Sequence, residues 1–149
     1  MGSEISMIIQ MSYFSRATSA MDDLALVALL DKARIKNFRR GIGGLLLYRD
    51  STFLQIIEGR APDVESLFET ISKDPRHYGI RLLLREEVTE RVFFAWRMGF
   101  LTPEALIHAH PYFSPALAQD EQTEPDAQFA QELIGLFRTG ALADLVVDA

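Results

Sequence analysis

The sequence predicts an α+β fold in which two helices cover one face of a sheet. Some segments repeat apolar residues with the period of 2 that is typical of strands, and others show the 3–4 spacing of helices. These segments follow one another as strand, helix, strand, strand, helix, strand, strand, the order of a ferredoxin-like sandwich. The chain has 149 residues, 48% of them apolar, which suits one compact domain that needs no disulfide.

The first strand is expected from Met7 to Tyr13, where apolar odd positions alternate with more polar even ones. The pattern indicates a half-buried strand whose odd positions face the core. The turn that follows has Ser19 and Asp22 in capping-box spacing, ahead of a helix expected from about Asp22 to Lys36. One stripe of this helix consists of Leu26, Leu29, Leu30, Ala33 and, one turn further, Asn37. The stripe therefore ends in a side-chain amide.

The segment "LLLYRDSTFLQIIEG" predicts a hairpin whose strands join at Arg49 to Ser51, after "RRGIGG" has ended the helix. On the second strand of the hairpin, one face carries Phe53, Gln55 and Ile57. The other face carries Leu54, Ile56 and Glu58. A glutamine in such an apolar run needs partners, because leaving a buried amide unpaired costs about 1–3 kcal/mol.

The second helix is expected to begin at Pro62 and to stop at "KDPRH". Its apolar stripe is Val64, Leu67, Phe68 and Ile71. The segments "YGIRLLLREEV" and "RVFFAWRMGFL" then read as two more strands. By alternation, the second of them points Phe94, Trp96, Met98 and Phe100 toward the helices.

The other face of this sheet needs a cover, because it would carry Leu45, Leu47, Leu54, Ile56 and Phe93. An apolar patch of this kind is normally an interface. Residues 102–149 follow the last strand as a tail. It has a short helix ended by Pro111, an acidic linker, and a helix ending near Gly140 with the stripe Phe129, Leu133, Leu136 and Phe137. Either this tail or a second chain is expected to cover the sheet.

Composition excludes several classes of protein. Without cysteine, the chain has no disulfide, thiolate nucleophile or iron–sulfur cluster. A net charge of -6 disfavours binding to nucleic acid, which relies on neutralising phosphates. No segment has the roughly 18 consecutive apolar residues of a membrane span, and we expect a cytoplasmic protein without a membrane partner.

Three inward polar groups converge near an aromatic wall: the phenol of Tyr13 and the amides of Gln55 and Asn37. No carboxylate pair, Ser-His-Asp order or metal-ligand cluster accompanies them. They suit the binding of a flat polar ligand better than hydrolysis. Each alone would be ordinary, since a lone tyrosine or glutamine is usually satisfied by water or backbone, and an asparagine after a helix is often a cap.

Two further motifs carry no site. His108 and His110 stand two residues apart and do not share a helix face, and no third metal ligand is apparent. The "GIGG" segment follows a helix and precedes a strand, the reverse of the order that places a phosphate at a helix N-terminus.

Five motifs, in register from about Met7 to Leu101, resemble those of the BLUF family of blue-light sensors that use flavin. They are "QMSYFSRAT", "KNFRRGIGGLLLY", "STFLQIIEG", "ISKDPRHYGI" and "RVFFAWRMGF". The resemblance implies residues 1–101 as the photosensor domain and 102–149 as a helical tail for sheet cover, oligomerisation or output. It implies a non-covalent flavin between the two helices. This flavin is usually FAD, and FMN and riboflavin are the alternatives to it.

The resemblance also implies roles for individual residues. Tyr13 matches the photoactive tyrosine that gives an electron and a proton to the excited flavin, and Gln55 the glutamine that bridges this phenol and the flavin N5/O4 edge. Asn37 matches the asparagine on the pyrimidine side of the ring. Further residues match positions around the flavin or its network: Ser15, Phe53, Ile71, Asp74, Arg76, His77, and Trp96 and Met98, whose positions report the light state.

The chain departs from the family pattern at Gly43, where a threonine is usual, and at Ala33, where a small hydroxyl residue is usual. Each change removes a polar contact near the site. No cyclase or phosphodiesterase pattern follows residue 101, so we expect no catalysis. We expect a homodimer or larger assembly and a separate downstream protein as partners.

Two alternatives stay open at this point. One is a flavin-free ferredoxin-like dimer that binds a small ligand and acts as a regulator. The other is a small-molecule phosphatase, which needs an arginine in a phosphate-cradling loop after the first strand; Arg16 fits this position only loosely. The visible spectrum of the purified protein separates these alternatives from a flavoprotein.

Overall fold

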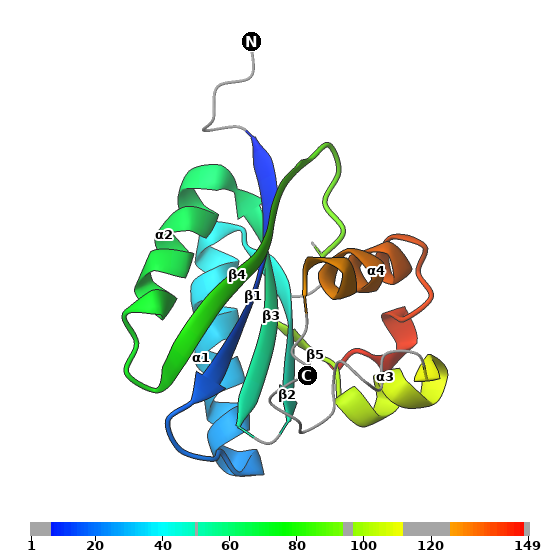
Figure 1. Cartoon of the computed structure of the whole chain (residues 1–149). Helices are drawn as coiled ribbons and strands as arrows, with labels where there is room; N and C mark the ends of the chain where they lie inside the picture. Colours follow the sequence, from blue (N-terminus) through cyan, green and yellow to red (C-terminus); the bar gives the residue numbers. More distant parts are fainter. Residues whose placement is uncertain (1–6, 50, 94–96, 112–125, 148–149) are drawn as a thin grey trace.

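The computed structural model describes residues 7–49, 51–93, 97–111 and 126–147. Its elements, in chain order, are β1 (Ile8–Ala17), α1 (Asp23–Arg40), β2 (Gly43–Arg49), β3 (Thr52–Arg60), α2 (Ala61–Ser72), β4 (His77–Val88), β5 (Gly99–Phe100), α3 (Pro103–Ala109), α4 (Ala127–Arg138) and a short 3-10 helix (Ala143–Leu145). Helices α1 and α2 lie on one side of the sheet, and α3 and α4 lie on the other (Figure 1).

The strand order β4-β1-β3-β2-β5 confirms the ferredoxin-like α+β prediction. Neighbouring strands pair antiparallel except at the edge, where β5 runs parallel to β2. The register of the central pair sets Tyr13 of β1 directly opposite Gln55 of β3. Because directly opposed residues point to the same face of a sheet, their side chains meet on the side of α1 and α2.

The helices α1 and α2 bury their predicted stripes against the sheet. On α1, Leu26 and Leu30 are buried and Leu29 and Ala33 are partly buried; on α2, Val64 is fully buried. These side chains form one core with the inward residues of β1 and β3, among them Ile9, Met11, Tyr13, Phe53 and Ile57.

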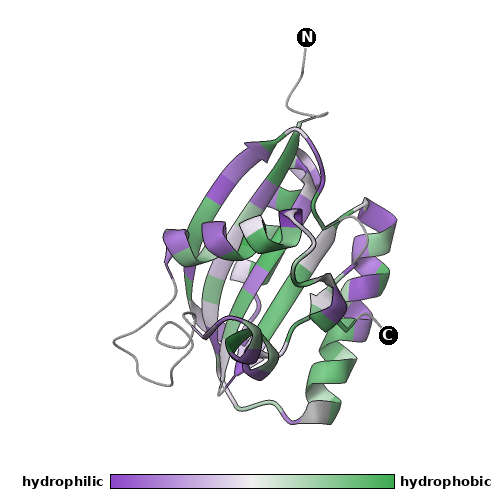
Figure 2. Ribbon diagram, turned by 90° about the vertical axis from the view of Figure 1, so that its right-hand side faces the viewer, coloured by the Kyte–Doolittle hydropathy of each residue, from purple (hydrophilic) through white to green (hydrophobic). Residues whose placement is uncertain are grey.

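The opposite face of the sheet is covered by the chain's own tail. The apolar residues predicted for this sheet face form a second core with residues that follow β5. The sheet face contributes Leu45, Leu47, Leu54, Ile56 and Phe93, and the later residues are Leu101, Leu106, Phe129, Leu133, Ile134, Phe137 and Leu142. Figure 2 looks onto this side, with hydrophobic stretches of strand behind the helices. The prediction of a half-buried first strand is therefore wrong, since β1 is buried on both faces nearly throughout.

Helix α1 is one turn longer than the sequence pattern predicted. It continues to Arg40 and ends at Gly41, whose φ of 66° is the left-handed conformation that glycine adopts without strain. Asn37 therefore lies inside the helix rather than after it. At the other end the cap is Asp22, which accepts a hydrogen bond from the Ala25 N–H, and not Ser19.

The last predicted strand, 91–101, is largely wrong within the described residues, where only Gly99 and Phe100 form a strand. Val92 and Phe93 do not join the ladder, because their N–H groups donate to the carboxylate of Glu58 at 2.7 and 2.9 Å. Met98 and Phe100 nevertheless pack on the helix side and Phe93 on the tail side, as the alternation predicted. Phe94 and Trp96 lie outside the described residues.

No helix in the described part of the chain is both long and apolar enough to span a membrane.

Candidate functional site

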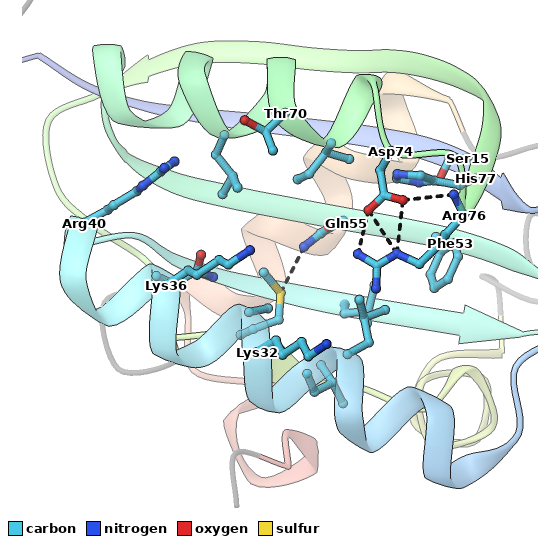
Figure 3. A pocket seen from close by; sticks show the side chains of 18 of the residues that line it. Ser15, Lys32, Lys36, Arg40, Phe53, Gln55, Thr70, Asp74, Arg76 and His77 are labelled. Carbon is cyan, nitrogen blue, oxygen red and sulfur yellow. Dashed lines mark hydrogen bonds and ion pairs between the residues drawn. The ribbon is translucent and has the colours of Figure 1, made fainter.

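A cavity of about 380 Å³ opens between α1, α2 and the inner face of the sheet (Figure 3). Its walls combine apolar side chains with polar groups that come from every surrounding element. A cavity of this size, largely apolar with a few convergent polar groups, is typical of a small-molecule site.

Tyr13, Gln55 and Met98 form a hydrogen-bonded chain at the sheet wall of this cavity. The fully buried hydroxyl of Tyr13 donates to Oε1 of Gln55, and Nε2 of Gln55 donates to Sδ of Met98 at 3.3 Å. Burial raises the pKa of Tyr13 well above its ordinary value, so the phenol keeps its proton at neutral pH. Gln55 and Met98 line the cavity directly, and Tyr13 reaches it through Gln55.

Gly44 on β2 makes room for this arrangement. A Cβ at this position would collide with the carbonyl oxygen of Ile56 and would lie 3.3 Å from Cε of Met98. Only glycine therefore lets β2 and β3 approach with the Met98 side chain in its present position.

Asn37 lines the cavity from α1 and is almost completely buried. Its Nδ2 donates to the backbone oxygen of Arg97, the residue before Met98. One turn earlier on the same helix, Nε of Arg34 donates to the backbone oxygen of Met98 at 3.0 Å. Helix α1 thus holds two successive carbonyl groups of the segment that carries Met98.

The end of the cavity beyond α2 is polar. Ser15 Oγ lies 3.0 Å from Nδ1 of His77, and burial lowers the pKa of His77, so the neutral imidazole is favoured. Arg76 binds Asp74 through two nitrogens. Hydrogen bonding to Arg76 lowers the pKa of Asp74 to about 2, and the same pairing raises the pKa of Arg76.

A row of cations along α1, which the sequence analysis missed, borders the cavity. Lys32, Lys36 and Arg40 are spaced four residues apart and line it together with Arg39 (Figure 3). The signal was present in the sequence, since i, i+4 and i+8 share one helix face next to the stripe that ends at Asn37. In a chain of net charge -6, this local excess of positive charge favours an anionic group at the cavity mouth.

Most residues that the sequence predicted for the site do line this cavity: Ser15, Asn37, Phe53, Gln55, Ile71, Asp74, Arg76, His77 and Met98. Tyr13 does not line the cavity, but its hydroxyl donates to Gln55, which does. Trp96 lies outside the described residues. Among the described residues, no three side chains of His, Cys, Asp or Glu gather as a possible metal site.

A second polar cluster lies on the tail side of the sheet. Glu58 is fully buried, and its carboxylate accepts hydrogen bonds from Nε2 of Gln10 at 2.8 Å and from the N–H groups of Val92 and Phe93. The sequence analysis assigned Glu58 to this face but gave it no role. The sequence feature that could have indicated a role for Glu58 is the same as for Gln55: each is a polar residue in an otherwise apolar strand.

Comparison with known proteins identifies the family. The family model described as sensors of blue-light using FAD, abbreviated BLUF, matches residues 8–99. The chain belongs to the BLUF family. The BLUF resemblance read from the five motifs is thereby confirmed, and the family is one of flavin-binding photoreceptors.

BLUF proteins of known structure share the fold over nearly the whole chain. The dark-state structure of BlrB, a BLUF protein, covers 91% of this chain and 98% of its own at 29% identity, with a TM-score of 0.77. The ground state of BlsA covers 89% of this chain and 88% of its own at 30% identity, with a TM-score of 0.75.

BLUF relatives known by sequence are longer proteins. The photoactivated adenylate cyclase subunit beta of Euglena gracilis is 33% identical over 97 residues, which are 64% of this chain and 11% of that protein. The blue light- and temperature-regulated antirepressor BluF of Escherichia coli K12 is 36% identical over 111 residues, 74% of this chain and 27% of that protein. The chain therefore spans a small part of these relatives' length.

Proposed function

We propose that this chain is a blue-light photoreceptor that holds a flavin non-covalently in the cavity between α1, α2 and the sheet. The observation that carries the proposal is the hydrogen-bonded chain from Tyr13 through Gln55 to Met98 at the cavity wall. A buried phenol joined to a cavity-lining amide places a redox-active group one hydrogen bond away from the cavity wall.

The cavity residues fit a flavin. Phe53 and Ile71 offer apolar surface to a flat ring, and Asn37 and Gln55 offer amide groups to its polar edges. The cations Lys32, Lys36 and Arg40 suit the phosphate groups of FAD or FMN and have no such use for riboflavin. Because the matching family model describes sensors that use FAD, we propose FAD as the cofactor, with Asp74, Arg76 and His77 closing the polar end.

Bound flavin supplies the blue-light chromophore and the acceptor for an electron and a proton. Tyr13 would donate both, because its hydroxyl is hydrogen-bonded to Gln55 at the cavity wall. Burial raises the pKa of Tyr13, so the hydroxyl keeps its proton until the electron leaves. While the phenol lacks its proton, it no longer donates to Oε1 of Gln55, and the amide is free to rotate or tautomerise. When Tyr13 recovers its electron and proton, Gln55 remains in the new hydrogen-bond arrangement, and absorption shifts slightly to the red.

The rearranged Gln55 changes its contact with Met98, and through it the segment leading into β5 and the tail. The described tail residues 102–111 and 126–147 contain the cover of the sheet, and residues 102–149 are the proposed output element. A coupling of about 1–3 kcal/mol is enough to bias two packings of the tail. The proposal includes a homodimer or larger assembly and a separate downstream protein.

The test is the Tyr13→Phe variant. We expect it to bind flavin and stay yellow, because the ring still fills its place in the core, but to lose the light-induced red shift. The visible spectrum before and after a blue-light pulse measures both properties.

The matched control is Tyr78→Phe, which removes the hydroxyl of an exposed tyrosine on β4 and is expected to keep the wild-type shift. A Tyr13→Phe protein that still shifts would overturn the role of Tyr13. A wild-type protein that is colourless when purified from flavin-replete cells would overturn flavin binding and favour a flavin-free regulator.

A further inference from the structure

Arg34 of α1 joins two segments that are far apart in the sequence. Its Nε donates to the backbone oxygen of Met98 at 3.0 Å, and its Nη2 donates to the backbone oxygen of Val147 at 3.1 Å. The side chain is only 16% exposed, and Nη1 lies 3.8 Å from the carboxylate of Asp31. Arg34 is not among the residues that line the flavin cavity.

Val147 is also paired with the edge strand of the sheet. Its N–H donates to the oxygen of Phe100, and the N–H of Phe100 donates to the oxygen of Val147, both at 2.8 Å. We call residues 142–147 the closing segment. Its first residue, Leu142, is completely buried in the core between sheet and tail, and the 3-10 helix Ala143–Leu145 leads from there to the Phe100 pair.

Met98 is the point at which this arrangement meets the photoactive chain. Its sulfur accepts from Gln55, and its backbone oxygen accepts from Arg34. A change in the Gln55 amide therefore acts on the same residue that Arg34 holds. The path from Gln55 to Val147 contains only two intervening residues, Met98 and Arg34, and each step is a hydrogen bond.

We propose that Arg34 is a positioning residue that transmits the state of Gln55 to the closing segment. This inference rests on the function proposed above and specifies the first tail residues that respond. In the dark, the planar guanidinium holds the Met98 and Val147 oxygens at fixed relative positions, which keeps Val147 paired with Phe100. When the hydrogen bond from Gln55 to the Met98 sulfur breaks, the Met98 carbonyl moves. Arg34 can then no longer donate to both the Met98 and the Val147 oxygens, so the hydrogen-bonded pair of Val147 and Phe100 opens.

The opened and closed pair of Val147 and Phe100 is the two-state element that coupling requires. Arginine suits this role because its donors are fixed in one plane, so displacement of one acceptor misaligns the other. A lysine has one compact ammonium group and can follow either oxygen alone.

The test is residue-resolved hydrogen exchange on the full-length, flavin-loaded protein, in the dark and under steady blue light. The amides of Phe100 and Val147 report the closing segment. The amide of Leu101 is an internal reference, because it donates to the oxygen of Leu46 on the opposite side. The red shift of the flavin is recorded on the same samples.

In the wild type we expect Phe100 and Val147 to exchange about tenfold faster in light than in the dark, with Leu101 unchanged. In Arg34→Ala, the Phe100 and Val147 amides should exchange in the dark as fast as they do in the illuminated wild type. Light should not change their rates further, while the red shift of the flavin persists. In Arg34→Lys, the dark exchange rates of these two amides should lie between those of the wild type and those of Arg34→Ala. The control Asp31→Asn removes the ion pair between Arg34 and Asp31, leaves both carbonyl contacts, and should behave as wild type.

Three results would overturn the inference, and they are distinguishable. If the wild type shifts to the red while Phe100 and Val147 exchange equally in dark and light, the closing segment is not coupled, although the proposed photoreceptor function stands. If Arg34→Ala, or Arg34→Lys where the alanine variant does not fold, retains the full light-dependent difference, Arg34 is not the link. If the wild type binds flavin but does not shift, the proposed function itself fails, and this inference falls with it.

Discussion

At the scale of single residues, the neighbours of Gln55 determine which way its amide points. The hydroxyl of Tyr13 can donate or accept, whereas the thioether of Met98 only accepts. The sulfur therefore selects the orientation in which the amino group of Gln55 donates to Met98 and its carbonyl accepts from Tyr13. The same logic explains why losing the phenol proton makes another orientation competitive.

His77 gives the protein a pH dependence of stability. Burial lowers its pKa from the ordinary value of 6.5, outweighing the backbone bond to Ile71 and the charge of Asp74, which raise it. Between the folded pKa and 6.5 the unfolded chain binds more protons than the folded one. The free energy of unfolding therefore has its full value above pH 6.5 and falls as the pH is lowered through the folded pKa.

We expect this fall in urea titrations carried out between pH of about 8 and about 5. In His77→Asn, which retains a polar side chain beside Ser15, the dependence on pH over this interval should be weaker. A variant whose stability depends on pH as steeply as that of the wild type would show that other groups cause the effect.

At the scale of elements, β3 works on both faces of the sheet. Gln55 accepts a hydrogen bond from Tyr13 on one side, and Glu58 binds the N–H groups of Val92 and Phe93, after β4, on the other. Phe93, whose N–H is bound by Glu58, packs its ring against that of Phe137 on α4, with the ring centroids 5.3 Å apart. A single strand therefore positions both the amide at the cavity wall and a contact with the tail.

Glu58→Gln tests the role of this carboxylate. An amide can accept through one atom only and turns an amino group toward donors, so we expect a loss of about 2 kcal/mol in the free energy of unfolding. Faster hydrogen exchange at Val92 and Phe93 should accompany it. Glu87→Gln, at an exposed position of β4, is the control and should change neither quantity. Unchanged protection at residues 92 and 93 in Glu58→Gln would contradict the assignment.

At the scale of the whole molecule, the tail makes the sheet a central layer. The second core joins β2 and β3 to α3, α4 and Leu142, so the proposed output element also contributes to the stability of the sensor. Light could not change the packing of the tail without changing the free energy of the whole domain, and the reverse holds equally.

Phe137→Ala measures this contribution. Phe137 is buried under the sheet face, and its truncation leaves a cavity, so we expect a loss of about 3–5 kcal/mol in the free energy of unfolding. Glu132→Ala, on the exposed side of the same helix, loses only a pair with Gln128 and should change stability by at most about 0.5 kcal/mol. Equal stability of the two variants, measured by urea denaturation, would mean that α4 does not stabilise the sheet.

The amino-acid sequence predicted the element order, the two helix stripes and the faces of β3. These follow from local periodicity, because a strand alternates its faces and a helix returns to one face every three to four residues. The family motifs added the roles proposed for Tyr13, Gln55 and Asn37, and they placed Ser15, Asp74, Arg76 and His77 at the site. Even the need for a cover over the second face could be predicted, since apolar residues alternated onto it.

The folded chain was needed to show what covers that face, where the last strand begins and what Arg34 and Glu58 bind. Each of these depends on groups brought together from distant parts of the chain. The N–H groups of Val92 and Phe93 bind the Glu58 carboxylate instead of joining a strand, and Arg34 finds its acceptors at Met98 and Val147. Periodicity assigns a side chain to a face, but a hydrogen-bond partner is fixed only when the chain has folded around it.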